Sequence, residues 1–237
     1  MSLLKRWAIL MIGILAFAPV TFARDRDRAK KEEDRITNSS AVMREILNVP
    51  DNIPRDLLGK ARCIVVMPSV LKAAFIVGGA YGRGTMVCRT GKDFSGHWSA
   101  PAMYALEGGS VGFQIGGEAT DFVFLIMNDR GANSLLHSKV KLGADASVAA
   151  GPVGRTTAAD TDAHLRSEIL SYSRARGVFV GVSLEGSTLR PDDKANHDLY
   201  GRSVTATQIV RESEVRTPSI AKSLIAVLEN ASPRLRS

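Results

Sequence analysis

The middle of the chain combines β-forming residues with repeated glycines, and this combination limits the possible folds most. Apolar residues alternate with small or polar ones over 110–115 and 177–184, while residues 122–127 are continuously apolar. Alternation with period two is typical of strands with one buried face, and a continuous apolar run favours a strand buried on both. Glycine weakens a regular strand, so its repetition indicates bends, bulges or close backbone contacts. We therefore predict a strongly curved, glycine-rich antiparallel sheet, either barrel-like or a sandwich.

Helical spacing appears on both sides of this region. Apolar residues recur every three or four positions within 220–228 and, before the sheet, at helical spacing in Ile36, Met43, Ile46 and Leu47. N- and C-terminal helices that flank a sheet predict an α+β fold. The apolar stripe of the first helix has two possible uses. It packs on the sheet, as such stripes do in ordinary globular proteins, or it faces a membrane as an amphipathic helix.

Residues 1–23 are predicted to be a secretory signal peptide. Lys5 and Arg6 precede an apolar run over 7–18, Pro19 ends that run, and Ala23 completes a small-residue cleavage site. The run is short for a membrane span, although a retained N-terminal anchor is the alternative. We expect an exported protein that is periplasmic or secreted and lies at the periphery of a membrane.

The formal net charge of +7 indicates an acidic partner, and two of these charges leave with the signal peptide. Export argues against nucleic acid as that partner. Charges of both signs nearly cancel over 24–35, which predicts a charged leader or the first turns of a helix. With 45% apolar residues in the whole chain, residues 36–230 suffice for a single domain with a buried core, followed by a short tail at 231–237.

The two cysteines, Cys63 and Cys88, both lie in the predicted domain. An oxidising compartment allows them to form a disulfide. Two separate buried thiols are the alternative, because free cysteine is a common core residue. Their spacing leaves both possibilities open.

The pattern around Ser110, flanked by Gly108 and Gly112, matches the turn that carries the nucleophile of serine hydrolases. That turn requires a helix directly after the serine, whereas strand-like alternation follows here. The four histidines are isolated, and no histidine or cysteine spacing fits a zinc site. We therefore expect no catalytic residue, no metal and no cofactor, with a hydrolase that uses Ser110 kept as an alternative.

Four strings carry a resemblance to one family: VLKAAF at 70–75, WSAP at 98–101, GADASVAAGPVGR at 143–155 and YSRARGVFVGVSLEG at 172–186. They resemble the SYLF domain, also called the Ysc84-like or Ysc84 actin-binding family, in its stand-alone exported bacterial form. The resemblance extends over about residues 43–209. It implies a lipid-binding module, because eukaryotic members bind phosphoinositides at membranes and yeast members also bind actin. An exported protein does not meet actin, so we expect an anionic phospholipid or a membrane surface as the partner.

The residues expected to bind lipid are basic side chains near glycine turns, because arginine and backbone N–H groups together suit a phosphate. They are Lys72, Arg83, Arg155, Arg174 and Arg176. Ion pairs within the fold, with Asp145, Asp160 or Glu185, are the alternative use of Arg155 or Arg176. The sequence thus predicts a non-enzymatic lipid-binding protein of the cell envelope. A structural or protein-interaction factor of the periplasm is the second possibility.

Overall fold

A computed structural model of the chain describes residues 18–49, 53–74, 77–111, 116–152, 167–175, 178–181 and 186–232. In these residues nine strands form one curled sheet in the order β5-β9-β3-β2-β1-β4-β7-β6, with β8 also paired to β7. The strands are β1 (Cys63–Ala74), β2 (Val77–Cys88), β3 (Ala102–Val111), β4 (Gly116–Ile126), β5 (Val140–Lys141), β6 (Val148–Ala150), β7 (Ile169–Ala175), β8 (Val178–Gly181) and β9 (Thr188–Pro191).

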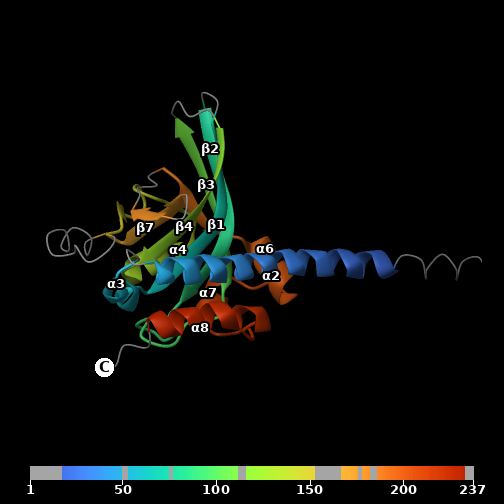
Figure 1. The fold of residues 1–237 in the computed structure, drawn as a ribbon. Coiled ribbons are helices and arrows are strands. Elements are labelled where there is room, and N and C mark those ends of the chain that lie inside the picture. Colours follow the sequence, from blue (N-terminus) through green and yellow to red (C-terminus); the bar gives the residue numbers. More distant parts are fainter. Residues whose placement is uncertain are drawn as a thin grey trace, which may run out of the picture.

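The predicted α+β class with a strongly curved sheet between N- and C-terminal helices is confirmed (Figure 1). The prediction of an antiparallel sheet needs one correction, because β6 and β7 run parallel. The chain returns from the end of β6 to the start of β7 through residues 151–168, which is long enough for a crossover connection. The other strand pairs in the described part of the sheet are antiparallel.

Helices cover both faces of the part of the sheet that contains Cys63 and Cys88. They are α2 (Ala18–Asn48), α3 (Arg55–Lys60), α4 (Asp129–His137), α6 (Asp193–Tyr200), α7 (Ala206–Val210), η1 (Ser219–Ala221) and α8 (Lys222–Ala231). The long helix α2 crosses the convex outer face with α8 beside it, and a hydrogen bond of 2.9 Å between the Ser40 and Ser223 hydroxyls joins the two (Figure 1). The charged residues 24–35 belong to α2, so they form helical turns.

The sheet separates two apolar cores, because neighbouring side chains on a strand point to opposite faces. The outer core packs α2 and α8 against the sheet, and includes Ile46, Leu125 and Leu224. The inner core fills the curl beneath α4 and α7, and includes Phe124 and Tyr104. Burial on both faces explains why β4 is continuously apolar near its end.

The apolar stripe on α2 belongs to the packed interior. Ile36, Met43 and Ile46 are fully buried, and Leu47 packs against the outer core. The sequence allows this stripe either to pack on the sheet or to face a membrane, and the structure shows that it packs on the sheet. In this conformation the stripe is not available to a membrane, so the membrane-facing interpretation of these four residues does not fit the described fold.

A β-bulge divides the central strands into two halves. β1 carries one extra residue between Val66 and Leu71 relative to β2, and a matching shift relative to β4. Within it Ser69 adopts a φ of 51°, and its N–H donates to the Asp121 carboxylate at 2.8 Å. We call Cys63–Met67 with Thr85–Cys88 the base, and the residues beyond the bulge the tip.

Candidate functional site at the tip of the sheet

The tip consists of four strand ends that extend past the helices. It comprises residues 71–74 of β1, 77–81 of β2, 107–111 of β3 and 116–119 of β4. Figure 1 shows these strands rising above α2, away from α8. Much of the tip is backbone without bulky side chains, since Gly79 pairs with Ala73 on one side and with Gly109 on the other.

Two large apolar side chains are exposed on the tip. Leu71 is 61% exposed and Tyr81 is 45% exposed, and these two are the exposed large hydrophobic residues of the described part of the chain. They are direct cross-strand partners, so they lie side by side on the outer face. An exposed apolar pair on a projecting element is typical of a contact surface rather than of a protein interior.

The sequence pattern does not predict this exposed pair, because the exposure depends on the bulge. In a regular strand, alternation places Leu71 on the inner face with Val65 and Met67. The extra residue in β1 reverses the alternation, so that Val70 becomes buried and Leu71 points outward. The available signal was Pro68 within an otherwise β-forming run, since proline in a strand is confined to edges, strand starts and bulges.

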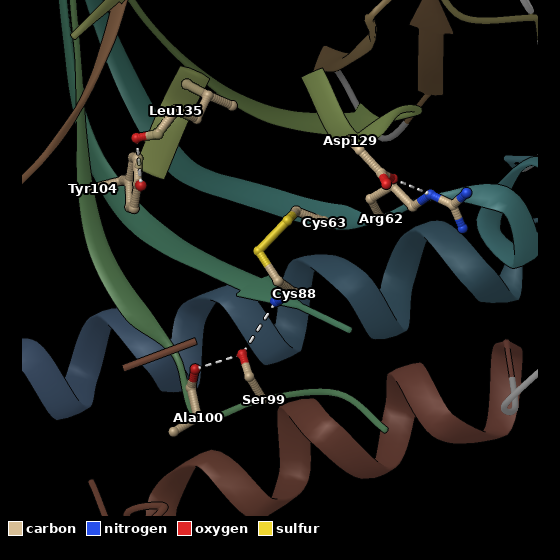
Figure 2. Close-up of a disulfide and its surroundings, with 8 residues drawn as sticks. All are labelled: Arg62, Cys63, Cys88, Ser99, Ala100, Tyr104, Asp129 and Leu135. Carbon is tan, nitrogen blue, oxygen red and sulfur yellow. Dashed lines mark hydrogen bonds and ion pairs between the residues drawn. A yellow bond between two sulfur atoms is a disulfide. The ribbon is translucent and has the colours of Figure 1, made fainter. Parts of the chain in front are cut away.

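A disulfide closes the opposite end of the β1–β2 hairpin. Cys63 and Cys88 are bonded, and both are completely buried at the base (Figure 2). The Ser99 hydroxyl accepts a hydrogen bond from the Cys88 N–H at 3.1 Å and donates one to the Ala100 carbonyl at 2.8 Å. Of the two alternatives for the cysteines, the structure therefore contains the bond. It links the two strands whose far ends form the tip.

Two predicted lipid-binding residues have side chains in the described structure, and both form ion pairs within the fold. The Nε of Arg83 lies 3.2 Å from the buried Asp192 carboxylate, and its guanidinium lies 5.7 Å from the centre of the Tyr81 ring. Arg174 pairs with Glu45 of α2 and lies 2.6 Å from Asp121, which also holds the bulge. Their charges are largely compensated, so these arginines serve the fold.

The remaining predicted residues divide by position. The backbone of Lys72 lies in the tip, in register with Ala80 and Glu118 on the neighbouring strands. Arg155 and Arg176 lie outside the described residues. The structure thus places Lys72 next to Leu71 and Arg83 next to Tyr81, but Arg83 and Arg174 pair with carboxylates and do not form an open basic cluster.

A row of charged pairs marks the boundary between the tip and the covered sheet. Arg190 donates to the Glu107 carboxylate at 3.1 Å and 2.5 Å, which holds the pKa of Glu107 below its ordinary value. On α2, burial raises the pKa of Glu32, and the adjacent Arg35 and Arg83 only partly offset this. The compensated pair of Arg190 and Glu107 leaves Leu71 and Tyr81 as the chemically distinct feature of the tip.

The fold gives no support to the hydrolase alternative. The backbone of Ser110 pairs with Gly78 within β3, and the strand continues to Val111. A nucleophile turn instead requires a helix directly after the serine.

Among the described residues, no three histidine, cysteine, aspartate or glutamate side chains gather into a group that could hold a metal ion. No helix in the described ranges has both the length and the apolar character to cross a bilayer.

Comparison with known proteins gives a consistent family relationship. The family model described as "Las17-binding protein actin regulator" (Ysc84) matches residues 107–231. Protein YSC84 of Saccharomyces cerevisiae is 34% identical over 203 residues, which cover 84% of this chain and 42% of that protein. SH3 domain-containing YSC84-like protein 1 of Homo sapiens is 33% identical over 185 residues, which cover 77% of this chain and 53% of that protein. The chain therefore spans about half the length of these relatives.

Proposed function

The chain belongs to the Ysc84 (SYLF) family, and on that premise we propose that it is a non-enzymatic protein that attaches to lipid bilayers through its sheet tip. The observation that carries the proposal is the exposed pair of Leu71 and Tyr81 on a projecting, glycine-rich part of the sheet. Leucine contributes apolar area, and tyrosine suits the membrane interface because its ring is apolar and its hydroxyl is polar.

Charge contributes less to the proposed membrane attachment than the five basic residues in the sequence predict. Lys72 follows Leu71 directly, and a basic residue near an anionic membrane contributes about 1 kcal/mol. Arg83 and Arg174 are occupied by Asp192, Asp121 and Glu45. We therefore propose that apolar insertion dominates and that anionic lipid adds a modest preference.

We also propose that the protein works outside the cytoplasm. The predicted signal peptide at 1–23 supports this, and so does the buried Cys63–Cys88 disulfide, because such bonds persist in oxidising compartments. Fractionation of the native host, with the oxidation state of both cysteines determined by thiol labelling, tests the location. Recovery in the cytoplasm with both thiols reduced would contradict it.

Vesicle flotation tests the lipid proposal. We expect the purified protein to float with phosphatidylcholine vesicles and somewhat more with vesicles that contain equal parts of phosphatidylglycerol. The double variant Leu71→Ser, Tyr81→Ser removes the insertion area, so vesicle binding should fall by about 100-fold or more, because burial of each such side chain contributes about 1.5–3 kcal/mol. Both side chains are exposed at the tip, so the variant should unfold at the same urea concentration as the parent.

The matched control is Leu71→Ile, Tyr81→Phe, which keeps the apolar area and should keep vesicle binding. A second control, Lys72→Gln, should lower binding only to the anionic vesicles. Equal flotation of the serine variant and the parent would contradict insertion at the tip. Absence of flotation with either vesicle would overturn the lipid proposal as a whole.

A protein partner is the second candidate, because a similar protein of Saccharomyces cerevisiae is named LAS seventeen-binding protein 3 and the family model is described as an actin regulator. An exposed apolar pair also suits a protein contact. Co-sedimentation with actin filaments tests the described partner directly. Binding to filaments that the serine variant loses, without any binding to vesicles, would favour this candidate over lipid.

A further inference from the structure

A hollow with basic side chains lies on the side of the molecule where α4 and α7 meet the loop after β2. It has a volume of about 400 Å³, within the range of small-molecule sites. Three segments that are distant in sequence line it: the loop with Lys92, α4 with His137, and the region of α7 with Arg211 and Glu212. All of these residues belong to the described structure.

Arg211 is fixed in position at this hollow. Its guanidinium carbon lies 3.8 Å from the centre of the ring of Phe94, which is completely buried. Its Nη2 donates to the Lys92 carbonyl at 2.9 Å. An arginine that is stacked and hydrogen-bonded in this way loses little further freedom when it binds a ligand.

The charge of Arg211 has no anionic partner in the described part of the chain. No carboxylate lies within ion-pair distance of it, and its Nη1 is enclosed without a hydrogen-bond partner among the described residues. Arg83, Arg174 and Arg190 all have such partners. The Phe94 ring and the Lys92 carbonyl stabilise this cation only in part, so a ligand that supplies a negative charge would offset the remaining cost of its burial.

Two more potential donors border the same hollow. The Nδ1 of His137 lies 2.8 Å from the Asn133 carbonyl, which can only accept, so Nδ1 carries a proton and Nε2 donates to an anion only in the imidazolium form. The ammonium of Lys92 is on an exposed side chain. The hydroxyl of Thr207 already donates to the Leu136 carbonyl at 3.3 Å. Glu212 is the one carboxylate on the lining, and it opposes the three basic groups.

We infer that this hollow binds a phosphate group. Arginine with lysine and histidine around one cavity suits the several oxygens of a phosphate better than a single carboxylate, because each oxygen accepts more than one hydrogen bond. The phosphate can belong to a soluble ester or to a lipid headgroup. The hollow is separate from the sheet tip, since none of its lining residues belongs to the tip.

Titration of the full-length protein with inorganic phosphate, followed by amide chemical shifts in NMR, tests the site. Sodium chloride keeps the ionic strength constant. We expect saturable shifts that include Lys92, His137 and Arg211. Arg211→Lys should weaken phosphate binding about tenfold, because lysine lacks the planar fork of donors. Arg55→Lys, on the exposed start of α3, is the matched control and should leave the affinity unchanged.

Glu212→Gln is the most discriminating variant, because a site that binds an anion gains affinity when a negatively charged carboxylate is removed from its lining. We expect phosphate binding to strengthen about threefold, whereas Glu33→Gln on α2 should have no effect. Shifts that do not saturate, or a Glu212→Gln variant with unchanged affinity, would overturn the inference. If the Arg211→Lys variant unfolds, phosphate titrations of the Lys92→Ala and Glu212→Gln variants still test whether the hollow binds phosphate.

Two further titrations distinguish the source of the phosphate. Glycerol phosphate represents the soluble ester, and phosphatidylglycerol vesicles represent the headgroup. Displacement of bound inorganic phosphate by glycerol phosphate alone assigns a soluble ligand. Displacement by vesicles, retained in the Leu71→Ser, Tyr81→Ser variant, assigns a lipid headgroup and separates this site from the tip.

Discussion

The base and the tip of the β1–β2 hairpin belong to the same two strands but have opposite properties. At the base, Cys63, Val66 and Val87 are buried, and a disulfide joins the strands. Beyond the bulge, Leu71 and Tyr81 are exposed, and glycine replaces bulky residues on the neighbouring strands. The difference shows that one long strand pair can provide a packed core at one end and a contact surface at the other.

The bulge is the structural reason for the change. One extra residue in β1 reverses which face each later side chain occupies, and it also increases the local twist. The Asp121 carboxylate holds the bulge through the Ser69 N–H and pairs with Arg174. An arginine that the sequence suggested for lipid binding therefore contributes to the geometry that exposes Leu71.

Gly84, which lies next to Thr85 of the base, and Gly79 of the tip provide the largest contrast. A Cβ on Gly84 would lie 1.9 Å from the Val66 carbonyl oxygen, and backbone cannot move aside easily. Gly84→Ala should therefore destabilise the fold by about 3 kcal/mol or more. A Cβ on Gly79 in the tip would meet nothing closer than the Gly108 carbonyl oxygen at 3.7 Å, so Gly79→Ala should change stability by less than about 0.5 kcal/mol.

Urea unfolding followed by circular dichroism measures both free energies. The comparison between base and tip predicts a large difference between these two alanine variants, although each adds a single methyl group. Similar destabilisation by Gly84→Ala and Gly79→Ala would mean that the tip is packed as tightly as the strands beside the base. It would contradict the proposed difference in packing between the two regions.

Removal of the disulfide should have the second-largest effect. The bond closes a loop with a sequence separation of 25, so Cys63→Ala, Cys88→Ala should lower the free energy of unfolding by about 3 kcal/mol on the chain-entropy model. The tip lies beyond the bulge, so the folded variant should still bind vesicles. Urea midpoints with and without reductant provide the control, because reductant should shift the parent protein and not the variant.

The sequence predicted the parts of this molecule that depend on local periodicity. Alternation, continuous apolar runs and helical spacing predicted the curved sheet and its flanking helices. The partners of Arg83 and Arg174 were not predictable in this way, because Asp192 and Glu45 are distant along the chain and meet them only in the fold. The exposure of Leu71 was missed for a related reason, since it depends on a bulge that is fixed by Asp121 of another strand.

The smallest expected effect concerns Glu32, a buried carboxylate on α2. Its side chain is almost fully buried, and burial raises its pKa above the ordinary value, with Arg35 and Arg83 opposing and Asp192 adding to the shift. A raised pKa means that the folded state holds the proton more tightly than the unfolded state. The stability from the protonated carboxyl is fully present below the unfolded pKa and is lost as the pH rises through the folded pKa.

Glu32→Gln removes this loss, since a neutral amide occupies the same space. The variant should be more stable than the parent at about pH 7, and the gain should shrink as the pH falls to about 4, where the parent carboxyl becomes protonated. Urea midpoints at both pH values measure the difference, with Glu33→Gln on the exposed side of α2 as the matched control. A destabilised Glu32→Gln variant at neutral pH would show that the contact with Arg35 outweighs burial, and would place this carboxylate with the compensated pairs beside the tip.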